Sequence, residues 1–432
     1  MSISGTNTAL YGGFGTTAGA LSAALSGTNN TVYGGQSLAN VSVSGANSAL
    51  YGGFGSNIGA LSATLSGTND TVYAGDNDTA VTISATGIAN AVYGRFAAPA
   101  GTLAIVDTGL ATSVFAGLSD MAVTLSGAQA QLYGNFGSGP AAIQVFEQGT
   151  NDSILGGNSD LNVTIASGSK NAYVFGGSGP AGGSVNVIDL GTGATIGAGS
   201  GLANITASDG AFVVGGTGLL RFIGGAGTST VVGNSGGSEQ VTVGSGNFEL
   251  ATQTHNNATV IGGTGNVTLF GGNGSVINYI GNASGTALLV GQAGDDTLSA
   301  AGSSTSVTLF GGFDAGGHER IIAGSGADSL IAGAGADTLT GGAGADAFLF
   351  LKNSTSPGNT VGGRSDLVTD LSGSDFVYLG GYGTTAGAAI TSSTQGSGVV
   401  TWTLSDNTQV TFTNLSDVTL ADPTKNSHII IF

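Results

Sequence analysis

Three tandem nine-residue segments towards the C-terminal end constrain the fold of this chain more than any other feature. They are AGSGADSLI (residues 323–331), AGAGADTLT (332–340) and GGAGADAFL (341–349). Each contains Gly-x-Gly-x-Asp, followed two positions later by an apolar residue. Glycines permit a tight turn, the aspartate offers a hard oxygen ligand, and the apolar residue points into a core beside a short strand. The spacing therefore predicts stacked turns in which a carboxylate recurs every nine residues.

These segments resemble the RTX (repeats-in-toxin) calcium-binding family, whose repeat is written Gly-Gly-x-Gly-x-Asp-x-apolar-x. The resemblance implies a parallel β-roll in which two nonapeptides form one coil, with residues eighteen apart stacked on one edge. It implies Ca²⁺ as the cofactor. Asp328 and Asp346 then flank one ion, whereas Asp337 lies on the opposite edge and faces Glu319. Backbone carbonyls around the turn glycines complete the expected ligand set, at Gly324, Gly326, Gly333, Gly335, Gly342 and Gly344.

Two upstream segments resemble the motif less closely. GQAGDDTLS (291–299) keeps Asp296, a further candidate ligand, but has Gln292 in place of a glycine. DAGGHERII (314–322) places Glu319 in the aspartate position. We expect both to bind calcium poorly or not at all. Two alternatives stay open: Gly-Ala-Asp turns that stabilise a solenoid without metal, and a second calcium site at Asp76 and Asp78 in AGDNDTA.

The repeats continue to the N-terminal end of the sequence. Residues 1–40 and 41–80 align without gaps, and similar units begin at Val81, Val123, Val163 and Ile205. An apolar-Tyr-Gly motif or its relic recurs within them at steps of about twenty residues, so each unit is most simply two coils. Segments such as Val81-Thr-Ile-Ser alternate with the period of a strand. The sequence predicts an all-β, right-handed parallel β-solenoid of about 18 coils with a C-terminal β-rich cap.

Three regions are expected along the chain. Residues 1–204 form coils of about 20 residues in 40-residue double repeats, and residues 205–350 form a β-roll of about 18-residue coils that includes the calcium nonapeptides. Residues 351–432 form the cap, with a hairpin around Asp406-Asn407. The N-terminal coils are taken to lack the aspartate of the calcium motif. Side-chain amide ladders of Asn29, Asn69 and Asn151 are expected in its place.

Composition narrows the class of protein. The formal charge of −18 argues against nucleic acid and anionic lipid as partners. A hydrophobic content of 40% favours a packed structure over disorder. The absence of cysteine excludes disulfides and thiol catalysis. No apolar stretch approaches the roughly twenty residues of a membrane-spanning helix, so membrane insertion is not expected.

Catalytic motifs are not found in the sequence. The three histidines have no metal-ligand neighbour at helical or hairpin spacing. The sequence contains no His-Glu-x-x-His, and no Gly-x-Ser-x-Gly in a strand-turn-helix context, so the protease and lipase domains found in some RTX proteins are not expected here. The Gly-x-Gly patterns indicate turns. We predict that the protein is not an enzyme.

Strand faces provide a candidate assembly surface. Aligning TVYGG (31–35) with TLTGGAG (338–344) places Val32 inward and Tyr33 outward. An outer column is predicted from Tyr11, Tyr33, Tyr51, Tyr73, Tyr93 and Tyr133, continued as one apolar column by Ile223, Val232, Ile261 and Phe270. The opposite sheet presents Ser42, Ser44, Thr82, Thr124 and Thr164. A register one residue different would bury every tyrosine, and the sequence leaves that alternative open.

The ends of the chain suggest export and assembly. The N-terminal sequence has no basic and apolar signal peptide and starts directly in repeats, so the first coil is expected to be an uncapped edge. Head-to-tail stacking, or donation of strand 428–432 into that edge, would propagate into a filament or lattice. Residues 365–381, with Asp366, Asp370 and Asp375, are similar to the segment that follows the roll in RTX proteases and lipases. This resemblance implies type I secretion machinery as a partner.

These features together predict a secreted calcium-binding structural protein at the cell surface or outside the cell. It is expected to assemble with itself into a filament, biofilm matrix or surface layer. The alternative is an adhesin or ice-binding rod that acts through the Ser/Thr face, with a cell-surface polysaccharide as partner.

Overall fold

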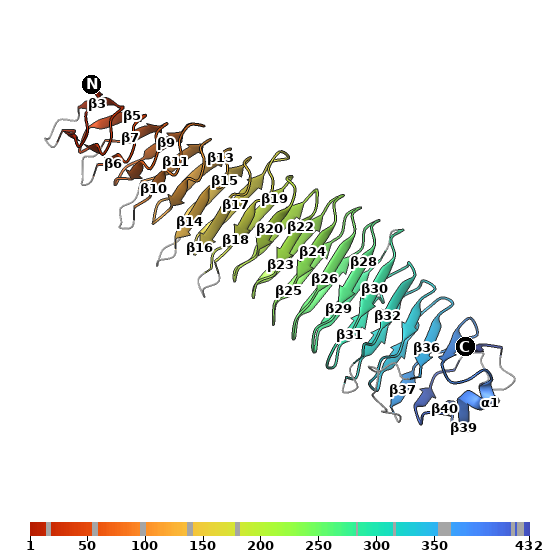
Figure 1. Ribbon diagram of the computed structural model, residues 1–432. Helices are drawn as coiled ribbons and strands as arrows, with labels where there is room; N and C mark the ends of the chain where they lie inside the picture. Colours follow the sequence, from red (N-terminus) through yellow and green to blue (C-terminus); the bar gives the residue numbers. More distant parts are fainter. Residues whose placement is uncertain are drawn as a thin grey trace. The chain divides into compact units, whose positions relative to one another are not determined.

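The chain folds into short strands that alternate between two parallel sheets (Figure 1). The computed structural model describes residues 1–13, 19–53, 59–95, 101–135, 141–177, 182–281, 284–313, 317–352, 364–415, 420 and 427–432. It forms two compact units, Met1–Leu220 and Arg221–Phe432. In each unit, odd-numbered strands up to β37 form sheet 1 and even-numbered strands up to β38 form sheet 2. The predicted parallel β-solenoid is confirmed.

In the N-terminal unit, each strand pairs in parallel with the strand one coil away. The strands of sheet 1 are β1 (Ser2–Ile3), β3 (Ala20–Leu25), β5 (Leu38–Val43), β7 (Leu61–Leu65), β9 (Thr79–Ile83), β11 (Leu103–Asp107), β13 (Met121–Leu125), β15 (Ala142–Glu147), β17 (Asp160–Ile165), β19 (Val185–Asp189) and β21 (Ala203–Ala207). The strands of sheet 2 are β2 (Ala9–Tyr11), β4 (Thr31–Tyr33), β6 (Ala49–Tyr51), β8 (Thr71–Tyr73), β10 (Ala91–Tyr93), β12 (Ser113–Phe115), β14 (Gln131–Asn135), β16 (Ser153–Gly157), β18 (Tyr173–Phe175), β20 (Ala194–Gly197) and β22 (Ala211–Val214).

The C-terminal unit repeats this arrangement, after β23 (Leu219–Gly224) at the boundary between the units. Its sheet 1 contains β25 (Ser238–Thr242), β27 (Asn257–Ile261), β29 (Val276–Ile280), β31 (Thr297–Ser299), β33 (Arg320–Ile322), β35 (Thr338–Thr340) and β37 (Ser365–Val368). Its sheet 2 contains β24 (Ser229–Val232), β26 (Phe248–Ala251), β28 (Val267–Phe270), β30 (Ala287–Val290), β32 (Val307–Phe310), β34 (Ser329–Ile331), β36 (Ala347–Leu351) and β38 (Phe376–Gly380).

A β-rich cap follows the last coil. It comprises α1 (Ala386–Ala389), β39 (Ile390–Gly396), β40 (Val399–Leu404), β41 (Gln409–Phe412) and β42 (Ile429–Ile431). Strands β40 and β41 form the predicted antiparallel hairpin, with Asn407 at a positive φ of 67°. Strand β42 pairs in parallel with β38 of the same chain. Within this chain the C-terminal strand therefore extends sheet 2. Donation of strand 428–432 to another molecule stays a prediction from the sequence.

Alternation of side chains decides which residues form the core. In sheet 2 the middle residue of each short strand points inward, and Val32, Leu50 and Val72 are at most 1% exposed. Their neighbours Tyr33 and Tyr51 point outward, so the predicted register is correct. The predicted continuation as one apolar column is wrong. Val232 and Phe270 lie on the outer face of sheet 2, but Ile223 and Ile261 lie on sheet 1, because successive nonapeptides occupy opposite sheets.

The turns between the sheets use left-handed backbone. Asn29, Asn69 and Asn151 have φ values of 57°, 56° and 58°, which asparagine tolerates better than most residues. A side-chain amide bond joins Asn171 Nδ2 to Asn151 Oδ1 at 3.0 Å. Asn29 and Asn69 instead contribute backbone bonds: their N–H groups donate to Ala46 O at 2.9 Å and Ile88 O at 3.0 Å. The expected amide ladder is thus found at Asn151, while the other two asparagines shape the turn.

A second, buried polar column lies one residue further along these turns. The Oδ1 atoms of Asn30, Asp70 and Asn90 accept hydrogen bonds from backbone N–H groups one coil earlier, at 2.8–3.0 Å. Asp152 does the same for Ala130 N at 2.6 Å. Each side chain is at most 1% exposed. The N-terminal coils therefore do contain buried aspartates two positions before an inward apolar residue, contrary to the expectation from sequence.

One coil of this unit buries two acids together. Glu147 ends β15 and Asp152 lies in the following turn, and both side chains are 0% exposed. The neighbouring coils place Leu125 and Ile165 at the Glu147 position. Burial, and next the negative charge of Glu147, raises the pKa of Asp152 to about 8, and burial also raises the pKa of Glu147. The pair is therefore most stable when it holds at least one proton.

Replacing Asp70 tests the buried turn acceptors. Asp70→Ala leaves Ser48 N–H buried without its acceptor and should cost about 1–3 kcal/mol of unfolding free energy. Asp70→Asn keeps an acceptor oxygen, as Asn90 does in the next coil, and should stay within about 0.5 kcal/mol of the wild type. Urea unfolding measured by circular dichroism compares the two. Equal destabilisation by both variants would show that the carboxylate charge, and not the hydrogen bond, is required.

The acid pair predicts a pH dependence. The pKa of Asp152 in the folded state lies above the unfolded value of about 4, so the folded state binds more protons and stability falls as pH rises from about 4 through about 8. Glu147→Leu, which installs the residue of the adjacent coil, should reduce this fall and raise unfolding free energy at pH 8 by about 1–3 kcal/mol. Thermal melts between pH 5 and pH 9 measure how stability changes with pH in the wild type and in Glu147→Leu, with exposed Glu249→Leu as the control. An unchanged slope in Glu147→Leu would contradict the assignment.

Candidate calcium-binding site

Buried carboxylates of the C-terminal unit form one row along the turns that lead from sheet 1 to sheet 2, here called turn row 1. Asp328 precedes β34, Asp346 precedes β36, and Asp375 precedes β38. Their Oδ1 atoms accept hydrogen bonds from Val307 N at 2.7 Å, Asp328 N at 2.9 Å and Asp346 N at 2.9 Å. The predicted stacking of Asp328 and Asp346 on one edge, eighteen residues apart, is found.

A second row lies along the turns that lead from sheet 2 to sheet 1, here called turn row 2. It contains Asp296, Glu319 and Asp337, which precede β31, β33 and β35, and Asp366, the second residue of β37. Asp337 Oδ1 accepts from Glu319 N at 3.1 Å, and Asp366 Oδ1 accepts from Asp337 N at 3.2 Å. Asp337 and Glu319 therefore adjoin on the edge opposite to Asp328, as the sequence predicted.

Glycine is required where these turns stack. A Cβ atom on Gly344, which has a φ of 136°, would collide with the carbonyl oxygen of Gly326 in the preceding coil. A Cβ atom on Gly335 would collide in the same way with Gly317 O. The candidate glycines therefore bring the carbonyl groups of adjacent turns close to the carboxylate rows. Such carbonyl oxygens are ligands that Ca²⁺ accepts.

Electrostatics of the two rows favour a bound cation. The side chains of Asp296, Asp328, Asp337 and Asp346 are each 1% exposed. Burial is the main cause that raises the pKa of Asp346 to about 7 and that of Glu319 to about 10, with neighbouring carboxylates adding to it. Asp346 Oδ2 and both Glu319 carboxylate oxygens have no hydrogen-bond partner. Buried, unpaired carboxylate oxygens are destabilising unless they are protonated or meet a positive charge.

An arginine shows that one end of turn row 2 accepts positive charge. Arg364 Nε lies 3.1 Å from Asp366 Oδ2, and Arg364 Nη1 donates to Gly333 O at 2.7 Å. A carboxylate and a turn carbonyl thus converge on one cationic group. Across the described ranges, no three His, Cys, Asp or Glu side chains cluster as a metal site. Any ion in these turns must therefore combine carboxylates with backbone carbonyls.

A protein-family model matches the sequence of these turns. The model for the RTX calcium-binding nonapeptide repeat matches residues 256–275 and 313–348 in four copies. This chain carries RTX repeats. Their cofactor is Ca²⁺. No curated protein matches the chain. Asp328, Asp337 and Asp346 lie inside the matched ranges, and Asp296 lies outside them.

The repeat pattern also continues upstream and downstream of the three nonapeptides, at positions that were not predicted to belong to the site. In the matched range 256–275, the positions equivalent to Asp328 hold Asn256, Val267 and Ser275, two residues before Ala258, Leu269 and Ile277. Beyond the matched range, Asp366 and Asp375 continue the two carboxylate rows. Their sequence signal is the same Asp-x-apolar pattern, with buried Val368 and Val377 in the apolar position. From the sequence, Asp366 and Asp375 are assigned only to the segment that follows the roll.

The carboxylates of the AGDNDTA turn have local partners. Asp76 forms an ion pair with Arg95. Asp78 Oδ1 accepts from Thr102 Oγ1 at 2.7 Å and from Thr102 N at 3.1 Å, and these bonds lower its pKa. Both carboxylates thus have partners in the next coil, a basic side chain for Asp76 and a hydroxyl for Asp78. These contacts argue against the alternative of a second calcium site here.

The tyrosines form a continuous stack on the outer face of sheet 2. Adjacent rings lie 4.7–5.2 Å apart at interplanar angles of 4–13°, from Tyr11 through Tyr33, Tyr51, Tyr73, Tyr93 and Phe115 to Tyr133. We call these seven residues the aromatic column. Burial between neighbouring rings raises the pKa of Tyr51. The parallel register of the strands sets the ring spacing, since equivalent residues lie one strand apart.

The outer face of sheet 1 carries hydroxyl groups on alternate coils. Thr82, Thr124 and Thr164 stand in register on this face, and Val106 and Phe146 occupy the coils between them. Ser42 and Ser44 are exposed in an earlier coil. The predicted Ser/Thr face is therefore present, but in this segment it alternates with apolar side chains.

Removing one carboxylate from turn row 1 should weaken the response to calcium. At a calcium concentration of about 100 times the Kd, one bound ion adds about 2.7 kcal/mol of stability. Asp346→Asn should lose most of that increment, and without calcium it should be at least as stable as the wild type, because it removes a buried charge. Fluorescence of Trp402, the single tryptophan and 0% exposed, follows urea unfolding of this unit. Exposed Asp209→Asn is the control. An equal calcium-induced shift in Asp346→Asn and the wild type would contradict a role for Asp346.

Proposed function

We propose that this protein is a secreted structural protein that folds around calcium outside the cell and associates with itself into a filament, matrix or surface layer. The aromatic column is the observation that carries the self-association. Seven stacked rings form a ready-made contact surface along one side of the N-terminal unit, and such surfaces on soluble proteins mark interaction sites.

Calcium acts through both carboxylate rows. Asp328 and Asp346 hold one ion together with carbonyls near Gly324, Gly326, Gly342 and Gly344. Asp337 holds a second ion with carbonyls near Gly333 and Gly335, and Asp296 contributes more weakly. Binding energy of this kind is also folding energy, because the ligands are brought together only when the coils stack. The C-terminal unit would then be ordered at high calcium concentration and labile at low concentration.

Uncharged residues flank the aromatic column. The second outward position of these strands holds Ala9, Thr31, Ala49, Thr71, Ala91, Ser113 and Gln131. A chain with a formal charge of −18 repels its own copies, so copies approach most easily through a face without carboxylates. We therefore propose side-by-side contact between aromatic columns. Head-to-tail stacking of coils remains a prediction from the sequence.

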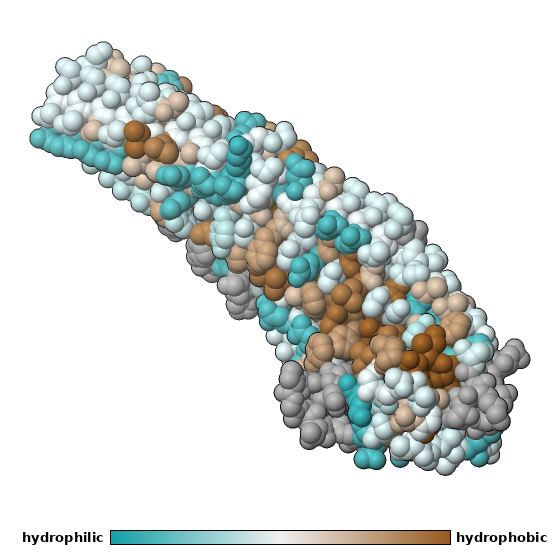
Figure 2. All heavy atoms as spheres, turned by 45° about the vertical axis from the view of Figure 1, so that its right-hand side comes forward, coloured by the Kyte–Doolittle hydropathy of each residue, from teal (hydrophilic) through white to brown (hydrophobic). Residues whose placement is uncertain are grey.

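The RTX repeats support secretion, and the lack of protease and lipase motifs in the sequence supports a non-enzymatic role. Proteins with such repeats are generally exported, and the family implies type I secretion. The described residues include no helix of the length and hydropathy that crossing a membrane requires. The face shown in Figure 2 is pale over most of the N-terminal unit and carries a larger group of hydrophobic residues over the C-terminal unit.

Electron microscopy and sedimentation velocity test the assembly. Wild-type protein in millimolar calcium should form filaments or sheets and should remain dispersed after chelation. The double variant Tyr51→Ser and Tyr73→Ser interrupts the ring stack and should raise the critical concentration for assembly by about tenfold, because two ring contacts are each worth about 0.5–1.5 kcal/mol.

The matched control is Thr64→Ser, at an outward position of sheet 1. It should assemble like the wild type. Monodisperse wild-type particles in calcium at every concentration would refute self-association, and normal assembly of the tyrosine double variant would refute the aromatic column as its surface.

A further inference from the structure

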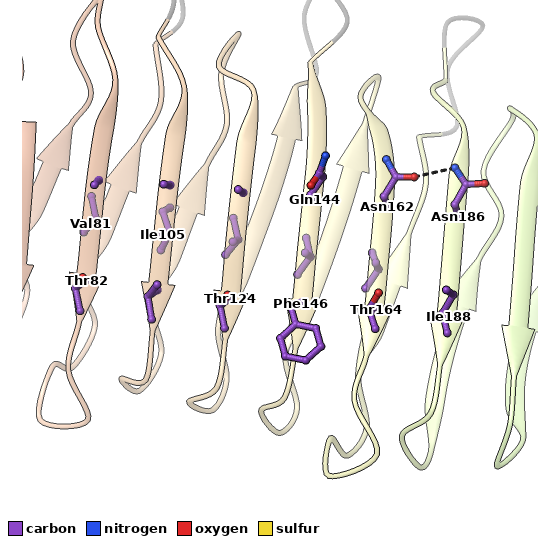
Figure 3. A pocket seen from close by; sticks show the side chains of 17 residues that line it. Val81, Thr82, Ile105, Thr124, Gln144, Phe146, Asn162, Thr164, Asn186 and Ile188 are labelled. Atoms are coloured by element: carbon purple, nitrogen blue, oxygen red, sulfur yellow. Dashed lines mark hydrogen bonds between the residues drawn. The ribbon is translucent and has the colours of Figure 1, made fainter. Parts of the chain in front are cut away.

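A long, shallow groove crosses sheet 1 of the N-terminal unit from β9 to β19 (Figure 3). Its volume is about 830 Å³. Two columns of outward side chains line it, one residue per strand in each column. The first column is Thr82, Val106, Thr124, Phe146, Thr164 and Ile188. The groove runs across the strands, so an occupant that follows it must be long and must repeat at the strand spacing.

All side chains that line this groove are uncharged, although the chain as a whole carries a formal charge of −18. An anionic polymer would be repelled by the chain and would find no cation in the groove. No carboxylate lines the groove itself. Exposed Asp120 and Asp160 lie two residues before the lining Ala122 and Asn162, and each already accepts a hydrogen bond from the next coil. The complementary occupant is a neutral molecule that makes hydrogen bonds and apolar contacts.

The second column consists of alanines at one end of the groove and of amide side chains at the other. Ala80, Ala104 and Ala122 form the floor at one end, and Gln144, Asn162 and Asn186 follow along the same column (Figure 3). Asn186 Nδ2 donates to Asn162 Oδ1 at 3.0 Å, and Asn204 Nδ2 donates to Asn186 Oδ1 at 2.7 Å. Each amide in this ladder keeps a further N–H and a further lone pair for a ligand. Within the row, Asn162 and Asn186 therefore present donors and acceptors whose orientation is set in advance.

The first column repeats every second strand. Hydroxyl groups of Thr82, Thr124 and Thr164 alternate with Val106, Phe146 and Ile188, which are 46%, 39% and 51% exposed. Two strand spacings make a period of about 10 Å. A linear β-1,4-linked sugar chain also has a two-unit period, because each ring is turned over relative to the last, and its length per ring is close to one strand spacing. Sugar rings offer hydroxyl groups at their edges and apolar C–H groups on their faces.

We propose that this groove binds a linear, neutral β-1,4-linked polysaccharide, laid across the strands with one sugar ring per coil. Ring faces contact Val106, Phe146 and Ile188, and ring hydroxyl groups bond to the threonines and to the amide row. This inference goes beyond the proposed self-association and does not depend on it, because the groove lies on sheet 1 and the aromatic column lies on sheet 2.

Binding of the calcium-loaded, full-length protein to defined polysaccharides tests the proposal. Insoluble cellulose and chitin should deplete the protein from solution, and their soluble hexasaccharides should compete. Amylose, which is neutral but α-linked, and polygalacturonate, which is anionic, should not. Failure to bind both cellulose and chitin, or equal binding to amylose, would overturn the proposal.

Two variants locate the binding surface. Phe146→Thr installs the residue of both neighbouring coils, so the fold should be kept, and should weaken hexasaccharide binding by about fivefold. Ala104→Glu places a charged side chain on the exposed floor and should abolish binding. Full binding by Ala104→Glu would overturn the assignment of the groove.

A matched variant separates this inference from self-association. Ala91→Glu introduces the same charge beside the aromatic column on sheet 2. It should impair assembly and leave glycan binding intact, whereas Ala104→Glu should do the reverse. If Ala104→Glu instead abolishes assembly and cellulose does not bind the wild type, the groove is a contact between copies of the chain and the glycan proposal is wrong.

Discussion

The hydrogen bond between a buried turn N–H and a side-chain oxygen of the next coil is the interaction on which both units depend. Parallel strands satisfy one another's backbone groups within the sheets, and isolated bridges between adjacent coils do so for part of the turns in the N-terminal unit. Other buried N–H groups of the turns need a side-chain acceptor. Asn30, Asp70, Asn90 and Asp152 supply the missing acceptor in the N-terminal unit. Asp328 does so in the C-terminal unit. One geometric requirement of stacked turns thus explains side chains that looked unrelated in the sequence.

Calcium chemistry follows from that arrangement. An acceptor in this position can be asparagine or aspartate, and both hold the turn. Only aspartate leaves a charged oxygen beside the carbonyls of adjacent turns, and repeated aspartates accumulate charge that burial penalises. Asp328 and Asp346 in adjacent coils reach that condition, whereas Asp70 is followed by Asn90. The difference between the units is therefore one of local charge density on a shared scaffold.

Sequence predicted the solenoid, its strand faces and the two carboxylate edges, because each follows from a period that is visible in the residues. Aligning Val32 with Leu339 predicted Tyr33 outward, but only the structure excludes the register shifted by one residue. The role of Asp70 and Asp152 was not predicted, because their turns lack the Gly-x-Gly spacing of the nonapeptides. They share with Asp328 only the shorter Asp-x-apolar pattern. The buried pair of Glu147 and Asp152 could not be predicted, since their encounter depends on where β15 ends and how tightly the turn closes.

The alternation of threonine with apolar residues on sheet 1 restricts how such a chain can change length. Insertion of a single coil would place two like side chains next to each other and shift every later residue of the column out of phase. Insertion of two coils, about forty residues, would leave the alternation intact. A protein of this kind therefore keeps its surface pattern only if its length changes by whole pairs of coils. The spacing of Thr82, Thr124 and Thr164, two coils apart, corresponds to that unit of length.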